Sequence, residues 1–371
     1  MKIALVHDYL VQNGGAERVL QCLTEIWPDA PIYTILYNDQ KFPRFKNKNV
    51  RTSFLQKVPF AKKYHRLFPP LMMNAIEEFN LDYYDLVLSD SSSFAKNIIT
   101  SPKTLHICYC HTPMRYAWDD CQHYTQEFGF PNWLKKIVPF LMNYIRVWDY
   151  FSSNGVDYFI ANSKFVQGRI KKYYQRKSIV INPPVKVDKF YITPKKELGN
   201  YFLVTGRMMK YKKTDLVIKV CNDLKLPLKI IGRGIELKNL KKIAGPTIEF
   251  LGRVSEKKLR EVYSKAQAFI FPQEEDFGIV AIEALASGRP IVAFRAGDIV
   301  EHVEDGKTGI FFENQTENSL KEALKKFKKT NFDSKYIRKT AMGFSEKIFK
   351  VKIKEEVENK YKIFLKKYEN N

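Results

Sequence analysis

The chain has 371 residues, 45% of them hydrophobic and 27% charged, which is the composition of a globular protein long enough to form two domains. Its formal net charge of +22 comes without a helix-turn-helix, aromatic RNA-binding or zinc-finger pattern, so nucleic acid is not an expected partner. No apolar run reaches the ~18 residues of a membrane span, and five cysteines without a CxxC pair favour reduced thiols in a cytoplasmic protein.

The first half of the chain alternates between buried-strand patterns and helical patterns. Apolar runs of strand length occur at 2–10, 31–37, 84–91, 104–112, 157–163 and 178–185. Helical patterns follow the first and the fifth of these runs, at 14–30 and 163–174. This alternation predicts a doubly wound parallel sheet with helices on both faces.

The alternation breaks once, in a segment that is rich in proline and lysine and has no periodicity. This segment, 185–199, is the predicted linker between an N-terminal domain (1–184) and a C-terminal domain (200–345). In the C-terminal domain, strand patterns return at 201–207, 226–234, 247–253, 268–273 and 290–296. A lysine-rich helical segment, 346–371, closes the chain.

The most informative stretch is EDFGIVAIEALASGRPIVAF, residues 275–294. It predicts a loop, a helix, a turn and a strand directly after another strand. In an open α/β sheet, ligands bind outside the carboxyl ends of the strands, where the free N–H groups of helix N-termini favour anions. The carboxylates of Glu275 and Glu283 suit sugar hydroxyls, and the N–H groups of Phe277, Gly278 and Ile279 suit a phosphate. The expected ligand carries both groups, as a nucleotide sugar does.

The same stretch resembles the donor-binding motif of retaining glycosyltransferases of family 4, which have the GT-B fold. The resemblance covers nearly the whole chain and implies two Rossmann-like, doubly wound parallel-sheet α/β domains that face a central cleft. It implies that the first domain binds the acceptor and the second the nucleotide sugar, with the last helix, 346–371, packing back on the first. By the same resemblance, Glu275 contacts hydroxyls of the donor sugar and Glu283 contacts the ribose.

The segment TGRMMKYKKTD, residues 205–215, follows a predicted strand and supplies cations at its carboxyl end. A departing diphosphate needs positive charge aimed at it; Arg207 offers a planar fork and Lys212 a point charge. The family carries an arginine and a lysine at this spacing, both on the donor diphosphate. The position after that lysine, often Gly or Arg in relatives, is Lys213 here, which is a mild departure. No Asp-x-Asp pair is present to hold Mg²⁺, so neither a metal nor another cofactor is expected.

Two glycine turns are weaker signals. Gly14 and Gly15 enter a helix, where a backbone can approach a phosphate, and the corresponding loop of the family closes on the donor phosphate. Gly232 lies in IIGRGIE, which lacks the last glycine of a GxGxxG fingerprint, so a nicotinamide enzyme is poorly supported. The resemblance places Gly232, Leu251 and Val254 near the nucleotide base.

The segment CYCHTPMRYAWDD, residues 108–120, places His111 at the end of a predicted strand. In the family, the equivalent histidine contacts the donor sugar, and no carboxylate here is placed to form a covalent glycosyl intermediate. Together with residues 206–216, this segment looks most similar to GDP-mannose-dependent α-mannosyltransferases of bacterial surface-polysaccharide assembly, of the O-antigen or capsule type. A UDP-sugar donor, glucosyl or N-acetylglucosaminyl, stays open because base selection depends on backbone contacts and loop shape.

The basic excess leaves further interpretations open. Residues 151–250 hold 21 basic and 7 acidic residues, and the segments 62–73 and 130–151 mix aromatic, apolar and cationic residues as interfacial segments do. Contact with the anionic inner leaflet of the cell membrane would bring the enzyme to a polyprenyl-diphosphate-linked glycan acceptor. A basic polyanion-binding protein is the non-enzyme alternative. A lysine-rich genome accounts for the charge, and buried helices account for the two segments, equally well.

Overall fold

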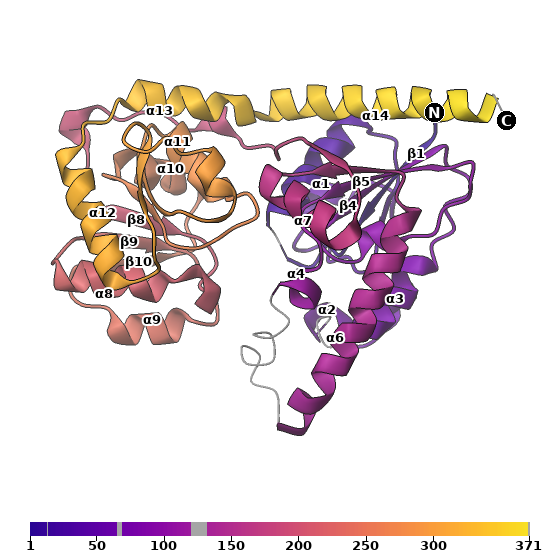
Figure 1. The fold of residues 1–371 in the computed structure, drawn as a ribbon, viewed down its shortest axis with the longest axis horizontal. Helices are drawn as coiled ribbons and strands as arrows, with labels where there is room; N and C mark the ends of the chain where they lie inside the picture. Colours follow the sequence, from indigo (N-terminus) through magenta and orange to yellow (C-terminus); the bar gives the residue numbers. More distant parts are fainter. Residues whose placement is uncertain (13, 65–68, 120–131, 370–371) are drawn as a thin grey trace. The chain divides into compact units, whose positions relative to one another are not determined.

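The computed structural model describes residues 1–12, 14–64, 69–119 and 132–369. The chain divides into two compact units, which are both visible in Figure 1. The first unit consists of Met1–Pro184 and Phe349–Asn371, and the second consists of Val185–Ile348. Each unit has its own parallel sheet, which confirms the expected fold class of two doubly wound α/β domains.

In its described residues, the first unit is built on a seven-stranded parallel sheet. Its strands are β1 (Ile3–His7), β2 (Ile32–Thr34), β3 (Val50–Thr52), β4 (Leu86–Ser91), β5 (Leu105–Cys110), β6 (Tyr158–Ala161) and β7 (Ser178–Val180). Their spatial order is β3-β2-β1-β4-β5-β6-β7, so the winding direction reverses between β1 and β4. β1, β4 and β5 are buried along their whole length, and β1 and β4 flank the switch point at which open α/β sheets bind ligands.

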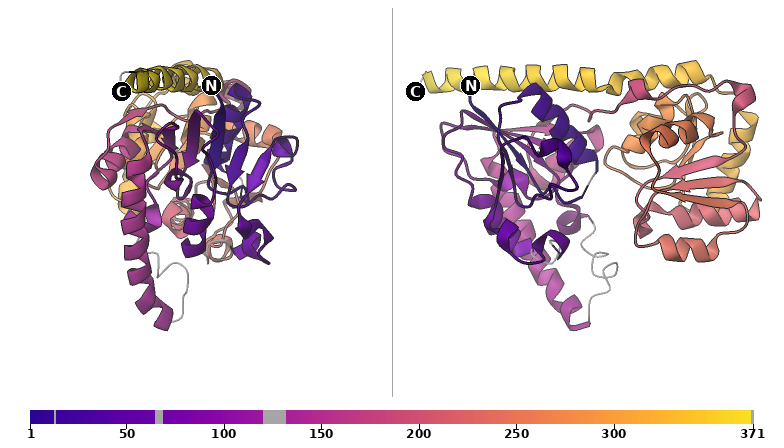
Figure 2. Two further views of the ribbon diagram at one scale, coloured as in Figure 1. Left: turned by 90° about the vertical axis from the view of Figure 1, so that its right-hand side faces the viewer. Right: turned by 180° about the vertical axis from the view of Figure 1, so that it is seen from behind.

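Helices cover both faces of this first sheet. They are α1 (Gly15–Ile26), α2 (Ala61–Tyr64), α3 (Pro69–Glu77), α4 (Arg115–Trp118), α6 (Asn132–Ser152), α7 (Lys164–Tyr174) and most of α14 (Glu346–Glu369). The apolar sides of α1 and α14 share one buried cluster with β1, while those of α2, α3 and α6 share another. Figure 2 shows α6 extending past the end of the sheet. Among the helices of the described ranges, none combines the length and apolarity needed to cross a bilayer.

The second unit has a six-stranded parallel sheet within its described residues, which are Val185–Ile348 without a gap. Its strands are β8 (Phe202–Thr205), β9 (Leu228–Ile231), β10 (Ile248–Gly252), β11 (Phe269–Phe271), β12 (Ile291–Phe294) and β13 (Gly309–Phe312). The spatial order β10-β9-β8-β11-β12-β13 puts the switch point between β8 and β11. The loops after these two strands hold the predicted diphosphate and sugar residues.

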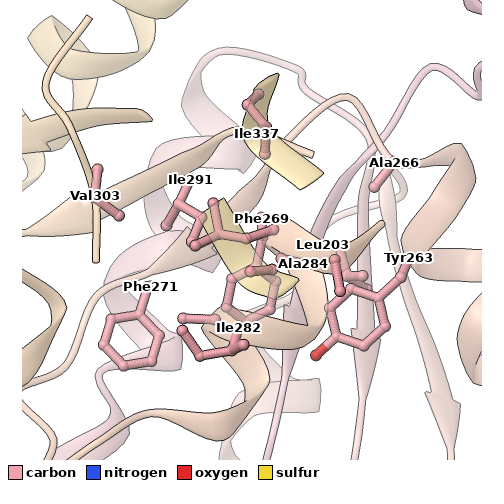
Figure 3. Close-up of a cluster of buried hydrophobic side chains, with 14 of the residues drawn as sticks. Leu203, Tyr263, Ala266, Phe269, Phe271, Ile282, Ala284, Ile291, Val303 and Ile337 are labelled. Carbon is pink, nitrogen blue, oxygen red and sulfur yellow. The ribbon is translucent and has the colours of Figure 1, made fainter. Parts of the chain in front are cut away.

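Two layers of helices cover the second sheet. They are α8 (Thr214–Asp223), α9 (Leu237–Ile243), α10 (Glu256–Lys265), α11 (Ile279–Ala286), α12 (Glu317–Lys329) and α13 (Ser334–Ala341). One buried cluster joins the sheet to α10, α11 and α13, and the other joins it to α8, α9 and α12. In Figure 3, Ile282 and Ala284 of α11 lie in the first cluster beside Phe269 of β11 and Ile337 of α13. The helix that carries Glu283 is therefore packed against a buried hydrophobic core.

The segment 185–199 packs into the second unit. The N–H group of Val185 donates to the carbonyl of Phe344 at 2.9 Å, and the side chains of Val187 and Phe190 are buried in the cluster around α11. The N–H group of Gly199 donates to the carbonyl of Lys265 at 2.8 Å. This aperiodic segment is thus held at several points by the second unit.

Candidate functional site

The loops after β8, β9 and β10 are bonded to one another at the carboxyl edge of the second sheet. The N–H group of Gly206 donates to the carbonyl of Ile231 at 3.0 Å, and that of Gly232 donates to the carbonyl of Gly252 at 2.9 Å. The residues that are predicted to contact the nucleotide base lie at this edge. Gly232 follows β9, and Leu251 and Val254 are partly buried against the cluster under α11.

Gly232 is a position where only glycine fits. Its φ of +145° lies in a region that other residues rarely adopt, and an added Cβ would lie 1.8 Å from the carbonyl oxygen of Gly206. The close approach of the two loops therefore depends on the missing side chain.

We expect Gly232→Ala to lower the free energy of unfolding by several kcal/mol, because the methyl group forces the β8 and β9 loops apart in addition to straining the backbone. Gly252→Ala is the matched control, since its φ is also positive, at +64°, but an added Cβ meets nothing within 4 Å. That variant should lose only about 1 to 2 kcal/mol. Urea denaturation of both variants measures the difference, and equal losses would contradict the role of the loop contact.

The structure brings together two predicted site residues from different loops. Lys212 ends the single-turn helix η8 (Lys210–Lys212) after β8, and Glu275 lies in the loop after β11. The ammonium group of Lys212 and the carboxylate of Glu275 form an ion pair, and the two side chains are only 14% and 20% exposed. Arg207, the other predicted cation, is exposed to solvent at the end of β8. The switch point thus presents two cations and a carboxylate.

The loop after β11 is anchored by its aromatic residue. The side chain of Phe277 is buried, with its ring centroid 5.2 Å from that of His302 and 5.7 Å from that of Phe344. Gly278, with φ +73°, is the N-cap of α11, which begins at Ile279. The N–H groups of Ile279 and Val280, the first two of the helix, lack intrahelical partners. The N–H group of Ala281 donates to the carbonyl of Gly278 at 2.8 Å. Phe277 can reach a ligand only through its backbone.

Glu283 lies in the second turn of α11 and is 4% exposed, so its carboxylate is far less accessible than that of Glu275. The first turn of the same helix is tied to β8. The hydroxyl of Tyr263 donates to the carbonyl of Val280 at 3.1 Å and lies 2.6 Å from the hydroxyl of Thr205. These bonds align the start of α11 with the loop that carries Arg207.

Sequence reasoning missed the residues that hold Glu275. The N–H group of Asp298 donates to the carbonyl of Glu275 at 3.1 Å, and Gly297, with φ +74°, leaves room for the Glu275 backbone. Asp298 is buried, which raises the pKa of its carboxyl group to about 6, and it is hydrogen-bonded to His302. The Gly-Asp pair after the strand pattern at 290–296 is the only signal in the sequence, and it does not reveal the partner.

In the first unit, His111 follows β5 at the centre of the sheet. Its ring Nε2 lies 2.6 Å from a carboxylate oxygen of Asp90, and its backbone carbonyl accepts a hydrogen bond from the side chain of Asn162 at 2.9 Å. Gly14 is the N-cap of α1, which starts at Gly15, and its N–H group donates to the carboxylate of Glu17. A cavity of about 370 Å³ lies elsewhere in this unit, between the loops before β5 and β6, and contains none of the predicted site residues.

Comparison with known proteins identifies the second unit. The family described as Glycosyl transferases group 1 matches residues 186–343. An uncharacterized glycosyltransferase of Methanocaldococcus jannaschii is 28% identical over 338 residues, which are 87% of this chain and 87% of that protein. The O-antigen chain mannosyltransferase RfbU of Salmonella typhimurium is 32% identical over 147 residues, which are 34% of this chain and only 39% of RfbU.

Among solved structures, HepE of Anabaena in complex with UDP and glucose is similar with a TM-score of 0.68. That likeness covers 96% of this chain and 99% of HepE at 18% identity, so it establishes the fold. The family match includes the loops after β8 and β11 and all of α11. Residues 186–343 therefore form a group 1 glycosyl transferase domain, and the chain is a glycosyltransferase with the GT-B fold.

Proposed function

We propose that this enzyme transfers a mannosyl group from GDP-mannose to a growing glycan with retention of configuration. The observation that carries the proposal is the ion pair between Lys212 and Glu275 at the switch point of the second sheet. A donor that carries both a diphosphate and sugar hydroxyls offers each of these side chains a partner. The mannosyl preference is supported by the resemblance of the segments around His111 and Arg207 and by the similarity to RfbU.

In this proposal most of the residues that bind the donor belong to the second unit, and the first unit binds the acceptor. Arg207 and Lys212 bind the diphosphate, and the N–H groups at the start of α11 support it. Glu275 accepts hydrogen bonds from the sugar hydroxyls, and Glu283 from the ribose. We further assign three residues to the nucleotide base: Gly232, Leu251 and Val254. Gly14 and Gly15 are assigned to the donor phosphate, and His111 to the donor sugar.

The proposed reaction needs neither a protein nucleophile nor a metal. The bond between the anomeric carbon and the diphosphate breaks while the acceptor oxygen forms a bond to the same face of that carbon. The acceptor hydroxyl loses its proton to the departing phosphate. Arg207 and Lys212 stabilise the charge that grows on the diphosphate.

A screen of three donors tests this function: GDP-mannose, UDP-glucose and UDP-N-acetylglucosamine, with transfer and donor hydrolysis both measured. We expect turnover with GDP-mannose and thermal stabilisation by GDP. Stabilisation and turnover with UDP compounds alone would favour the UDP-sugar alternative. Stabilisation by heparin, with no response to either nucleotide, would favour the polyanion-binding alternative.

We further propose that the acceptor is linked to polyprenyl diphosphate and that α6 contacts the anionic inner leaflet of the cell membrane. Exposed apolar side chains recur on α6 every three or four residues, so they form one stripe. They are Ile137, Phe140, Tyr144, Val147 and Phe151, which are between 47% and 78% exposed. The opposite face, with Val138, Met142 and Ile145, is buried in the unit. A helix that is apolar on two faces needs a second apolar partner.

The charges around α6 favour a lipid surface over another helix. Among the described side chains of α6, Arg146 is basic and partly buried, and the acidic Asp149 is buried against Lys96. Exposed lysines also occur on the neighbouring α2, which packs on the same buried cluster. Cations next to exposed aromatic side chains suit anionic headgroups above acyl chains. The acid–base pairs that select a partner helix are absent from the described residues of this stripe.

We expect Phe140→Glu to weaken cosedimentation with phosphatidylglycerol vesicles about 10- to 100-fold, because a buried phenyl group contributes roughly 1.5–3 kcal/mol. The control is Tyr83→Glu, which changes an equally exposed aromatic residue outside the stripe. Affinity for free nucleotide should not change in either variant. If Phe140→Glu instead converts a dimer to a monomer and leaves vesicle binding intact, the stripe is a protein interface.

A further inference from the structure

The cavity of about 370 Å³ in the first unit lies at the amino-terminal edge of the sheet, between the loops before β5 and β6. His111 follows β5 at the opposite, carboxyl-terminal edge, and the six residues of β5 separate the two edges by about 20 Å. The volume is within the ~300–1,000 Å³ of small-molecule sites and far exceeds the ~30 Å³ that one water molecule occupies in the liquid. The cavity is therefore large enough for an organic ligand and is separate from His111.

A buried asparagine contributes to the lining of this cavity. Asn97 ends the single-turn helix η4 (Ala95–Asn97) and is only 1% exposed. Neither Oδ1 nor Nδ2 of its side chain has a hydrogen-bond partner among the residues that the structure describes. Buried polar groups are nearly always paired with protein, water or a ligand, because an unpaired group loses its hydration without compensation. The amide therefore offers both an acceptor and a donor to a ligand in the cavity.

Two carboxylates of the lining are held in place by hydrogen bonds within the protein. The indole N–H group of Trp148 donates to Oε1 of Glu77 at 2.7 Å. The backbone N–H group of His106 donates to Oδ2 of Asp157 at 2.8 Å. A carboxylate has about four lone-pair positions on its two oxygens, so each of these groups can accept further hydrogen bonds. Glu77 and Asp157 are thus oriented acceptors in the wall of the cavity.

The loop before β6 is fixed by Arg176. Its guanidinium group donates to backbone carbonyls along this loop, those of Ser153, Asn154, Val156 and Asp157. The Nδ1 atom of His106 also lies 3.2 Å from the carbonyl oxygen of Gly155. On the other side of the cavity, the buried Ile98 and the 64% exposed Ile99 supply apolar surface. The cavity thus has an apolar side and a polar side built on a well-anchored loop.

A ligand that pairs with this lining must both donate and accept hydrogen bonds. The Nδ2 atom of Asn97 needs an acceptor, which neither a metal ion nor an ammonium group provides. The negative charges of Glu77 and Asp157 repel phosphates and carboxylates. A peptide backbone donates and accepts, but it binds chiefly as an added strand at a sheet edge, and the edge strands β3 and β7 contribute no residue to the lining. Neutral hydroxyl groups meet all these requirements.

We propose that this cavity is a second carbohydrate site, which binds one neutral hexose unit away from the donor residues. The amide of Asn97 bonds to two adjacent hydroxyls, accepting from one and donating to the other, while Glu77 and Asp157 accept from further hydroxyls. Ile98 and Ile99 pack against the C–H groups of the sugar ring. The hexose belongs to a glycan acceptor or to the head group of a glycolipid, which present the same hydroxyls. This site does not depend on which nucleotide sugar is the donor.

Saturation-transfer NMR with the full chain and methyl α-mannoside measures this binding without a nucleotide. We expect the wild type to bind the mannoside at least about tenfold more tightly than glucuronate or putrescine. Asn97→Leu removes a donor and an acceptor and should lower the affinity about 5- to 100-fold, with the affinity for free nucleotide unchanged. Thr100→Trp, which fills the cavity from a half-buried position of its lining, should abolish the binding that depends on Asn97.

Thermal unfolding separates a ligand contact from a structural role of Asn97. Because the amide of Asn97 is unpaired, Asn97→Leu should leave the Tm unchanged or raise it. Asn222→Leu is the matched control, since that amide donates to the carbonyl of Ile243 at 2.7 Å and accepts from the N–H group of Gly245 at 2.9 Å. The control should lower the Tm and leave mannoside binding intact. Equal losses of Tm in the two variants would overturn the inference, because Asn97 would then be paired within the protein.

Phosphatidylcholine vesicles with and without a monohexosyl diacylglycerol distinguish the two sources of the hexose. Glycolipid-dependent cosedimentation that Thr100→Trp abolishes assigns the site to a head group, whereas binding of the free mannoside alone assigns it to a glycan. The inference is overturned if the wild type binds neither form, if glucuronate binds equally well, or if mannoside binding survives unchanged in both Asn97→Leu and Thr100→Trp. Absence of transfer with every nucleotide sugar would instead count against the proposed function and leave these binding results unaffected.

Discussion

Glu275→Gln is expected to lower hexosyl transfer roughly 100-fold or more while the affinity for free nucleotide stays nearly unchanged. The glutamine keeps the shape of the side chain but loses the charge that pairs with Lys212 and that we assign to the sugar hydroxyls. Free GDP has no sugar to contact, so its binding does not depend on this carboxylate. Turnover assays and calorimetry with GDP and UDP measure the two effects separately.

Two further variants test whether the effect is specific to Glu275 and to the donor sugar. Glu274→Gln removes the neighbouring carboxylate, which is exposed, and should leave transfer unchanged. Glu283→Ala should weaken binding of the free nucleotide about tenfold or more, because a hydrogen bond to a charged group contributes about 1.5–3 kcal/mol. If Glu275→Gln and Glu283→Ala weaken nucleotide binding equally, the proposed division between sugar and ribose is wrong.

Arg207→Ala and Lys212→Ala should each lower kcat by at least about 100-fold, the cost of removing one group that stabilises charge in a transition state. The loss should appear in turnover more than in acceptor binding, since the charge on the diphosphate grows as the glycosidic bond breaks. The two variants should differ in the stability of the free enzyme. Lys212→Ala leaves Glu275 without its ion-pair partner, whereas Arg207 is exposed and its loss should not affect stability.

Lys210→Ala is the control for these two variants, because Lys210 is an exposed cation in the same turn. Its activity should match the wild type. Activity should also persist in EDTA, as expected where protein cations stabilise the leaving group. A strict requirement for Mg²⁺ would contradict that assignment.

The sequence by itself was sufficient to predict the central strands and the loops that follow them. β1, β4, β5, β8 and β11 are covered on both faces, so each appears as an apolar run followed by a polar or glycine-rich turn. The edge strand β3 (Val50–Thr52) was missed because its middle residue, Arg51, is charged and exposed, so the segment does not form an apolar run. β13 (Gly309–Phe312) was also missed, although it is buried.

Segments whose sequence fits more than one physical interpretation could be assigned only from the structure. The mixture of apolar and basic residues in 130–151 fits both a buried helix and an interfacial one. The part of it that the structure describes, within α6, is buried on one face and has an exposed apolar stripe on the other. Similarly, 185–199 has no periodicity, yet Val187 and Phe190 pack into the second unit. Periodicity reports one repeated face, so it cannot describe a helix with two apolar faces or an irregular segment with single anchors.

Only the tertiary structure determined which polar groups contact one another. The sequence placed Lys212 and Glu275 at the ends of two strands, but their ion pair depends on β8 and β11 being neighbours at the switch point. His7 and Asp90 are 83 positions apart, and no local pattern singles out either of them. Strand order in a parallel sheet follows from crossover connections and core packing, which are long-range properties. The sequence therefore determined the types of chemical groups, and the sheet topology determined their partners.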